Sequence, residues 1–240
     1  KLTIINPKTS TQTTYTLPSE PSRGYDDLRF LNGKAFVSVT NPVDSTSTVL
    51  GQLKFAQGKF TVISVLTAGA AAVDIAGNPV TLNIQDSDSL GVSPNGSLLL
   101  DDQGGDKGTA ALISVSKPGT AKQQVTFLPH TGTVVDDTVF APVGATSLLV
   151  ADTSGTSEGV YRISGPFTSG TAYSSATADN FVGTLDPTSG TITPFVSGLT
   201  SPHGLGFVSA QSVPEPSNGG LEALVVLGLG GGFLRKKLAN

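Results

Sequence analysis

The 240-residue chain contains no cysteine, no methionine and no tryptophan. Without cysteine it can form no disulfide, no thiolate nucleophile and no cysteine-ligated zinc site. Its two histidines, His130 and His203, are too few for a metal centre built from several imidazoles. Chemistry that depends on sulfur or on clustered histidines is therefore excluded.

Charged residues are also scarce. They make up 13% of the sequence, whereas an ordinary soluble domain contains roughly 25%. The net charge is −4, and the only basic block lies in the last six residues. Nucleic-acid binding needs a patch of lysine and arginine that neutralises phosphates. We therefore expect no nucleic-acid partner.

The sequence does contain many short apolar runs separated by turn signals. The runs are rich in Val, Ile, Thr, Leu and Phe, and helical periodicity is scarce before residue 220. Asn32-Gly33 and Asn95-Gly96 each lie between two such runs. Asn-Gly is a strong hairpin signal because both residues tolerate positive φ. The sequence predicts an all-β fold of successive antiparallel hairpins.

A repeat becomes visible when these segments are compared. Asp27–Val39, Asp88–Asp101 and Asp137–Asp152 each contain an acidic residue, an apolar strand, a glycine-containing turn and a second, more hydrophobic strand. We expect each segment to form a hairpin. Pro202–Val208 (PHGLGFV) matches the first half of a fourth copy.

Two further candidate strands follow the first half of each repeat. They are Val49–Phe55 with Phe60–Leu66, Ala111–Val115 with Val125–Leu128, and Phe181–Leu185 with Ile192–Val196. Four strands in roughly 40–50 residues match one blade of a β-propeller. We therefore predict a β-propeller of four-stranded antiparallel blades, with insertions at Ala68–Gln85 and Gly165–Asp179. A β-sandwich is the alternative.

Three segments resemble blades of the NHL and SMP-30/gluconolactonase-like group of propellers. They are Ser93–Asp102 (SPNGSLLLDD), Thr146–Ile163 with its TSLLVADT and GVYRI stretches, and Gly198–Phe207 (GLTSPHGLGF). The resemblance covers roughly residues 23–208. Pairing of Pro202–Val208 with Leu2–Leu17 would close a ring of four blades. The resembled families usually have about six blades, so we expect an N-terminally truncated propeller.

The C-terminal tail has a different composition. Val213–Ser217 (VPEPS) is followed by a largely apolar stretch at residues 219–234 and then by Arg235, Lys236 and Lys237. The stretch lies near the short limit for a membrane-spanning helix, and the cations would stop it on the cytoplasmic side. We predict a C-terminal hydrophobic helix. An amphipathic helix and a buried core strand are the alternatives.

The tail resembles the PEP-CTERM sorting signal of exported bacterial proteins. The resemblance implies that an exosortase, a membrane-embedded protease-like enzyme, recognises Pro214, Glu215 and Pro216, detaches the tail and releases or re-anchors the protein. It also implies a secretory signal, transient anchoring in the inner membrane, and a final location in the cell envelope, at the cell surface or outside the cell. We accordingly divide the chain into a propeller domain (1–211) and a sorting tail (212–240). Because the chain starts without a signal, we expect a fragment.

Acidic residues occur at or just before the predicted innermost strands. Propellers of the resembled group place ligands around the central channel at such positions, which here are Asp26, Asp27, Asp86, Asp88, Asp136, Asp137 and His203. Carboxylate oxygens suit Ca²⁺, so Asp27, Asp88 and Asp137 are candidate metal ligands. The alternative is that aspartates at strand starts cap turns. Leu90-Gly91 stands where the resembled lactonases would carry Asn-Gly.

His203 is the candidate catalytic residue. It follows Pro202 at the entry of an inner strand, and related lyases use a channel-facing histidine of such a Pro-His-Gly pattern as a base. A structural or exposed histidine is the alternative. A second acidic set would form either a Ca²⁺ loop or polar hairpin tips, and it consists of Asp101, Asp102, Asp106 and Asp152.

Two functional hypotheses follow. In the first, the propeller is a binding or structural module of an extracellular or exopolysaccharide layer, with a polysaccharide or a protein as its partner. In the second, it is a channel-site lactonase, hydrolase or lyase. Convergence of Asp27, Asp88, Asp137 and His203 on one point would favour the enzyme.

Overall fold

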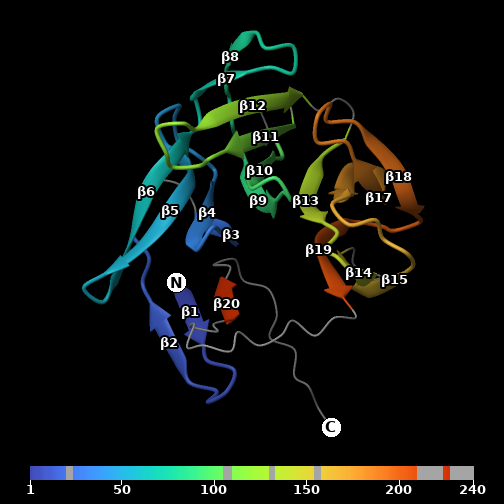
Figure 1. Cartoon of the computed structure of the whole chain (residues 1–240), viewed down its shortest axis with the longest axis horizontal. Helices are drawn as coiled ribbons and strands as arrows, with labels where there is room; N and C mark the ends of the chain where they lie inside the picture. The colour runs from blue at the N-terminus through green and yellow to red at the C-terminus, as the bar shows by residue number, and fades with distance from the viewer. Residues whose placement is uncertain (20–23, 105–109, 130–132, 154–157, 210–223, 228–240) are drawn as a thin grey trace.

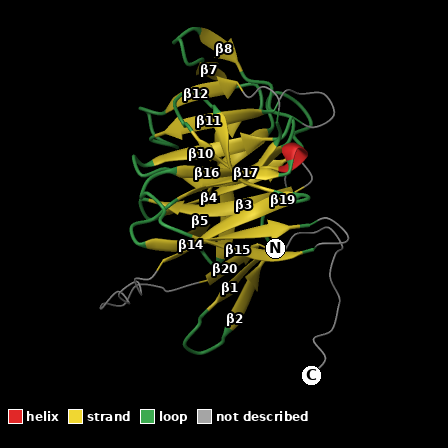
Figure 2. Ribbon diagram, turned by 90° about the vertical axis from the view of Figure 1, so that its right-hand side faces the viewer, coloured by secondary structure: helices red, strands yellow, loops and turns green. Residues whose placement is uncertain are grey.

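The structure, a computed structural model, describes residues 1–19, 24–104, 110–129, 133–153, 158–209 and 224–227. Four blade-like sheets lie around a common axis, and a fifth, smaller sheet lies beside the first blade (Figure 1). The predicted all-β, propeller-like arrangement is confirmed. In the side view of Figure 2, most strands of these sheets run across the picture and lie one above another. In the described part of the chain, no helix has the length and apolar character needed to cross a bilayer.

The first two blades follow the predicted order. The first contains β3 (Gly24–Leu31), β4 (Lys34–Thr40), β5 (Thr48–Ala56) and β6 (Lys59–Thr67). The second contains β9 (Ser87–Val92), β10 (Ser97–Asp102), β11 (Ala111–Ser116) and β12 (Gln124–Pro129). The insertion predicted at Ala68–Gln85 supplies β7 (Ala71–Val73) and β8 (Pro79–Thr81), which extend the second blade beyond β12.

The third and fourth blades are interlaced, which corrects the predicted third hairpin. β13 (Val135–Phe140) pairs with β16 (Ala172–Ala176), and β17 (Phe181–Leu185) and β18 (Ile192–Ser197) complete that blade. β14 (Ala145–Asp152) instead pairs with β15 (Gly159–Ser164) and with β19 (Pro202–Ser209). The predicted insertion at 165–179 therefore contains a blade strand and the 3-10 helix η1 (Thr177–Asp179).

The N-terminal strands form a separate sheet, so the predicted closure of the ring is wrong. β1 (Leu2–Ile5) pairs with β2 (Gln12–Tyr15) and with β20 (Leu224–Leu227). β19 and β1 lie in different sheets: β19 is an edge strand paired with β14, whereas β1 lies between β2 and β20. β20 also corrects the predicted C-terminal helix, since this part of the apolar tail is a strand. The remainder of the tail lies outside the described residues, and the division at residue 211 stays a prediction.

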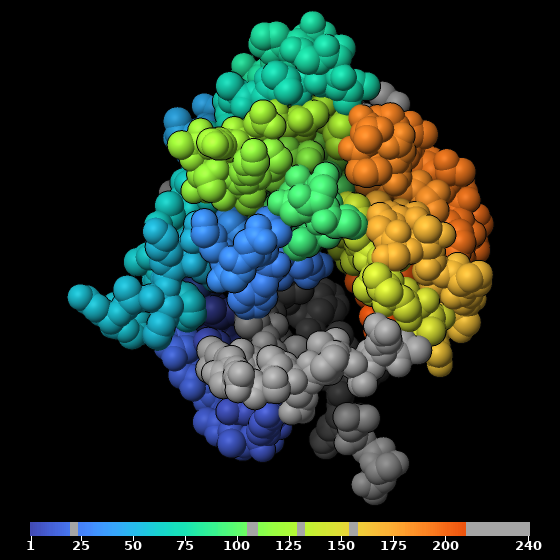
Figure 3. Space-filling model, in the orientation of Figure 1, coloured from blue at the N-terminus to red at the C-terminus, as the bar shows by residue number. Residues whose placement is uncertain are grey.

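Both faces of the central blades are buried, because successive side chains of a strand enter different cores. In β10, Leu98 and Leu100 pack in the core shared with the first blade, whereas Leu99 packs in the core shared with the third. Successive side chains of a strand point to opposite faces, so a strand between two blades must be apolar on both. Figure 3 shows the second blade (green) between the first (blue to cyan) and the third, of which β16, β17 and β18 are orange.

Candidate functional site: an acidic pocket at the propeller axis

The four inner strands share one irregularity. In each, two consecutive residues lie opposite a single residue of the neighbouring strand, which is a β-bulge. The bulged pairs are Asp26-Asp27 in β3, Asp88-Ser89 in β9, Asp136-Asp137 in β13 and His203-Gly204 in β19. A bulge re-aims the side chains at its position. The local pairing therefore brings the same two positions of every blade toward the axis.

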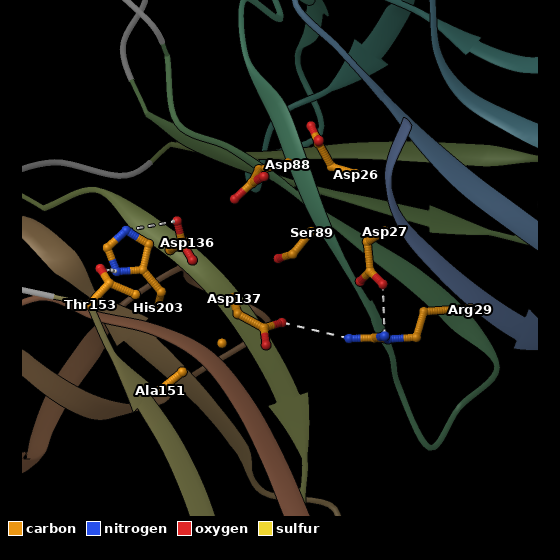
Figure 4. A pocket seen from close by; sticks show the side chains of 11 residues that line it. Asp26, Asp27, Arg29, Asp88, Ser89, Asp136, Asp137, Ala151, Thr153 and His203 are labelled. Carbon is orange, nitrogen blue, oxygen red and sulfur yellow. Dashed lines mark hydrogen bonds and ion pairs between the residues drawn. The ribbon is translucent and has the colours of Figure 1, made fainter. Parts of the chain in front are cut away.

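All eight bulge residues line one pocket of about 510 Å³. Arg29, Ala151 and Thr153 complete the lining (Figure 4). The structure thus brings together six of the seven residues expected at the channel. The seventh, Asp86, does not line this pocket, and its carboxylate accepts a hydrogen bond from the Thr40 hydroxyl (3.0 Å).

In two of the bulges, the aspartate at the second position forms a hydrogen bond to the neighbouring blade. The Asp27 carboxylate accepts a hydrogen bond from the backbone N–H of Leu90 in the next inner strand (2.9 Å). Asp137 accepts one from the N–H of Leu205 in the same way (2.7 Å). These two aspartates therefore hold adjacent inner strands together. This role differs both from metal binding and from the capping of a local turn.

In the second blade, the second bulge position is Ser89, which has no carboxylate. Asp101 of the same blade makes the connection to the next blade instead. Ser89 donates a hydrogen bond to Asp101 Oδ2 (2.7 Å), and Thr138 of the third blade donates to Asp101 Oδ1 (3.3 Å). Asp101 is fully buried and lies opposite the bulge of its own blade. The predicted hairpin-tip role of Asp101 is therefore wrong.

Asp102 and Asp152 hold the loops that lead into inner strands. The Asp102 carboxylate accepts the N–H groups of Gln85 and Asp86, and that of Asp152 accepts the N–H groups of Thr200 and Ser201. Both side chains are buried at the ends of blade strands rather than exposed at hairpin tips. Asp106, the last member of this set, lies outside the described residues.

Asp88 and Asp136 form an acidic pair across two blades. The side-chain amide of Gln103 donates to Asp88 Oδ2 (2.9 Å) and to Asp136 Oδ1. His203 Nε2 lies 3.9 Å from Asp136 Oδ1. His203 Nδ1 lies 2.8 Å from the Ser201 carbonyl oxygen, which can only accept, so this nitrogen carries a proton. Nε2 is left to face the acidic pair.

The described residues of the pocket bring five carboxyl groups together with a single guanidinium, that of Arg29. Burial, followed by the charges of Asp136 and Asp26, raises the pKa of Asp88 to about 9. Burial raises the pKa of Asp137 to about 7, although the Leu205 N–H and Arg29 oppose the shift. Burial also raises the pKa values of Asp26, Asp27 and Asp136. At neutral pH the pocket therefore retains protons that exposed aspartates would have lost.

Arg29 is the main cation of the pocket. Its Nη1 donates to Asp27 Oδ1 at 2.8 Å, and its Nη2 lies 3.8 Å from Asp137 Oδ1 in the third blade. Sequence reasoning missed both Arg29 and Gln103. Arg29 stands two residues after an acidic pair, which is a weak signal, whereas nothing around Gln103 distinguishes it.

The described residues contain no group of three acidic or imidazole side chains placed to hold a metal ion. The arrangement therefore adds no support for the Ca²⁺ ligands predicted at Asp27, Asp88 and Asp137. The tail residues Pro214, Glu215, Pro216, Arg235, Lys236 and Lys237, together with His130, lie outside the described residues. No protein-family model matches the chain, and no curated protein matches it either.

Proposed function

We propose that this is an exported, surface-sorted bacterial protein whose propeller is a binding module, with the axial pocket as its ligand site. The observation that carries the ligand site is the convergence of four equivalent bulges on one pocket, which the second candidate function below shares. Binding is placed first because Asp27 and Asp137, two of the four residues whose convergence would favour an enzyme, accept backbone N–H groups of neighbouring blades. The volume of the pocket, about 510 Å³, lies within the range of small-molecule sites, roughly 300–1,000 Å³.

Fold stability alone does not account for the acidic residues of the pocket. Asp27 and Asp137 connect inner strands, but Asp88 and Asp136 bond to the Gln103 side chain, which itself needs partners. Burying carboxyl groups next to one another is unfavourable. Such an arrangement is typical of functional sites, where pKa values depart strongly from their ordinary range.

The binding role is tested with the polysaccharide fraction of the producing bacterium. The wild-type chain should co-sediment with it, and the double variant Asp88→Asn with Asp136→Asn should lose most of this binding. Asp44→Asn, which changes a fully exposed carboxylate, is the matched control. If the wild type and the double variant co-sedimented equally, the pocket would not be the site that binds the polysaccharide.

Export and sorting are proposed from the tail. Replacing Pro214, Glu215 and Pro216 with alanine in the signal-bearing precursor should leave the protein membrane-bound. The unchanged precursor should lose its tail in an exosortase-positive host. Mass spectrometry of the two products checks this, and identical processing of both would contradict the sorting proposal.

A second candidate function is a hydrolase or lyase of the lactonase-like kind. One observation favours it: Asp88, with its pKa of about 9, can hold a proton beside Asp136 while His203 faces the same pair. A protonated acid next to a base is the arrangement used in general acid–base catalysis. Turnover of lactones or uronic-acid glycans that Asp136→Asn and His203→Gln each abolish would establish the enzyme.

A further inference from the structure

The side chains around the acidic pair can mainly accept hydrogen bonds. Asp26, Asp88 and Asp136 are half-buried carboxyls at the first position of three bulges. The charge of Arg29 is largely balanced by Asp27 at 2.8 Å, and the described residues of the lining include no other arginine or lysine. A matching ligand must bring positive charge and hydrogen-bond donors.

A second observation points in the same direction. Asp137 Oδ1 is buried and has no hydrogen-bond partner, and the Asp137 residue is only 7% exposed. The Arg29 guanidinium, 3.8 Å away, is too distant for a hydrogen bond. Buried carboxylate oxygens are almost always paired, and an unpaired one is unfavourable. Because Asp137 lines the pocket, a donor on a bound ligand would satisfy this oxygen.

The pocket suits an organic cation of a particular kind. Its volume of about 510 Å³ far exceeds that of a metal ion, and the described residues contain no metal-type cluster. No Phe, Tyr or Trp side chain is among the described residues that line it, whereas cages of such side chains recognise quaternary ammonium groups. A primary ammonium group carries three donors and needs acceptors around it.

We propose that the pocket binds the primary ammonium group of an amino sugar, with the sugar hydroxyls supplying further donors to its carboxyls. This inference rests on the proposed function, because the sugar follows from the assignment to a polysaccharide layer. Asp88 and Asp136 would hold the ammonium group between two blades, with the proton that Asp88 otherwise keeps released to solvent on binding. Asp137 Oδ1 would accept a hydrogen bond from the ligand.

The test is isothermal titration of the whole chain with glucosamine tetramer and with N-acetylglucosamine tetramer. The two differ by acetyl groups that remove the positive charges and leave the ring hydroxyls. We expect the glucosamine oligomer to bind at least about tenfold more tightly, as loss of a charge-assisted hydrogen bond predicts. Asp88→Asn and Asp136→Asn should each remove most of this preference, whereas Asp44→Asn should keep it.

Equal affinity for the two tetramers, or no binding of either, would overturn the inference. So would displacement of the glucosamine oligomer by Ca²⁺ through the same carboxyls, since the pocket would then be a metal site. If neutral glycans bound in a manner that depended on Asp88, the proposed binding function would stand and the ammonium preference alone would fail.

Discussion

Gly91→Val is expected to lower the free energy of unfolding by about 3 kcal/mol, the upper part of the range for overpacked sites. Gly91 lies in the inner strand β9, and a Cβ atom there would stand 2.9 Å from the backbone carbonyl oxygen of Thr138 in β13. A backbone oxygen of a packed strand cannot move aside as a flexible side chain can. The second and third blades would have to separate. Urea unfolding followed by circular dichroism measures the loss.

Gly206 offers a matched control from the same position of another blade. It stands two residues after the bulge of β19, as Gly91 does in β9. A Cβ at Gly206 would meet no atom within 4 Å. Gly206→Val should therefore change stability by no more than about 0.5 kcal/mol. Equal losses of stability in the two variants would contradict the open space that the structure places beside Gly206.

The folded protein is expected to lose stability as the pH rises from 5 to 9. Asp88 and Asp137, with pKa values of about 9 and 7, keep protons in the folded state that unfolded aspartates, near 3.8, have already lost. Folding therefore takes up protons in this window. The stability that these two carboxyl groups contribute is fully present below 3.8, the pKa of an unfolded aspartate. It is lost as the pH rises through their folded pKa values of about 7 and 9. Each retained proton contributes about 1.4 kcal/mol per pH unit.

The decline should be steeper between pH 5 and 7 than between pH 7 and 9, because Asp137 has released its proton by the upper interval. Asp88→Asn should flatten the profile and raise stability at pH 8, since the amide does not ionise. Asp44→Asn should leave the slope unchanged, because that carboxyl is exposed and its pKa is lowered by hydrogen bonds within its own loop. Urea titrations at several pH values measure the slopes. A wild-type stability that rises from pH 5 to 9 would contradict the raised pKa values.

Local pattern predicted the blades wherever their strands are consecutive in the chain. The hairpins of the first two blades have the turns that Asn32-Gly33 and Asn95-Gly96 indicate. The turn chemistry and the alternation of apolar residues act over a few residues, so they can be recognised in a sequence. The same reasoning placed acidic residues at the starts of inner strands, and most of them line the pocket.

The errors arose where pairing is not local. Asp137–Asp152 has the composition of a hairpin, yet β13 pairs with β16 and β14 pairs with β19. An apolar strand buries its faces equally well against any partner of the right register, so composition does not select the partner. The apolar stretch of the tail is ambiguous for the same reason, and its described segment pairs with β1.

The sequence alone determined the fold class, the hairpins of the first two blades and the positions of the acidic pairs, because these depend on neighbouring residues. The tertiary structure decided what each carboxyl does. Asp27 and Asp136 occur in identical Asp-Asp pairs, but one accepts a backbone N–H from the next blade and the other faces Asp88 and His203. The bulge gives the two members of a pair different directions, and only the adjacent blade determines what each meets.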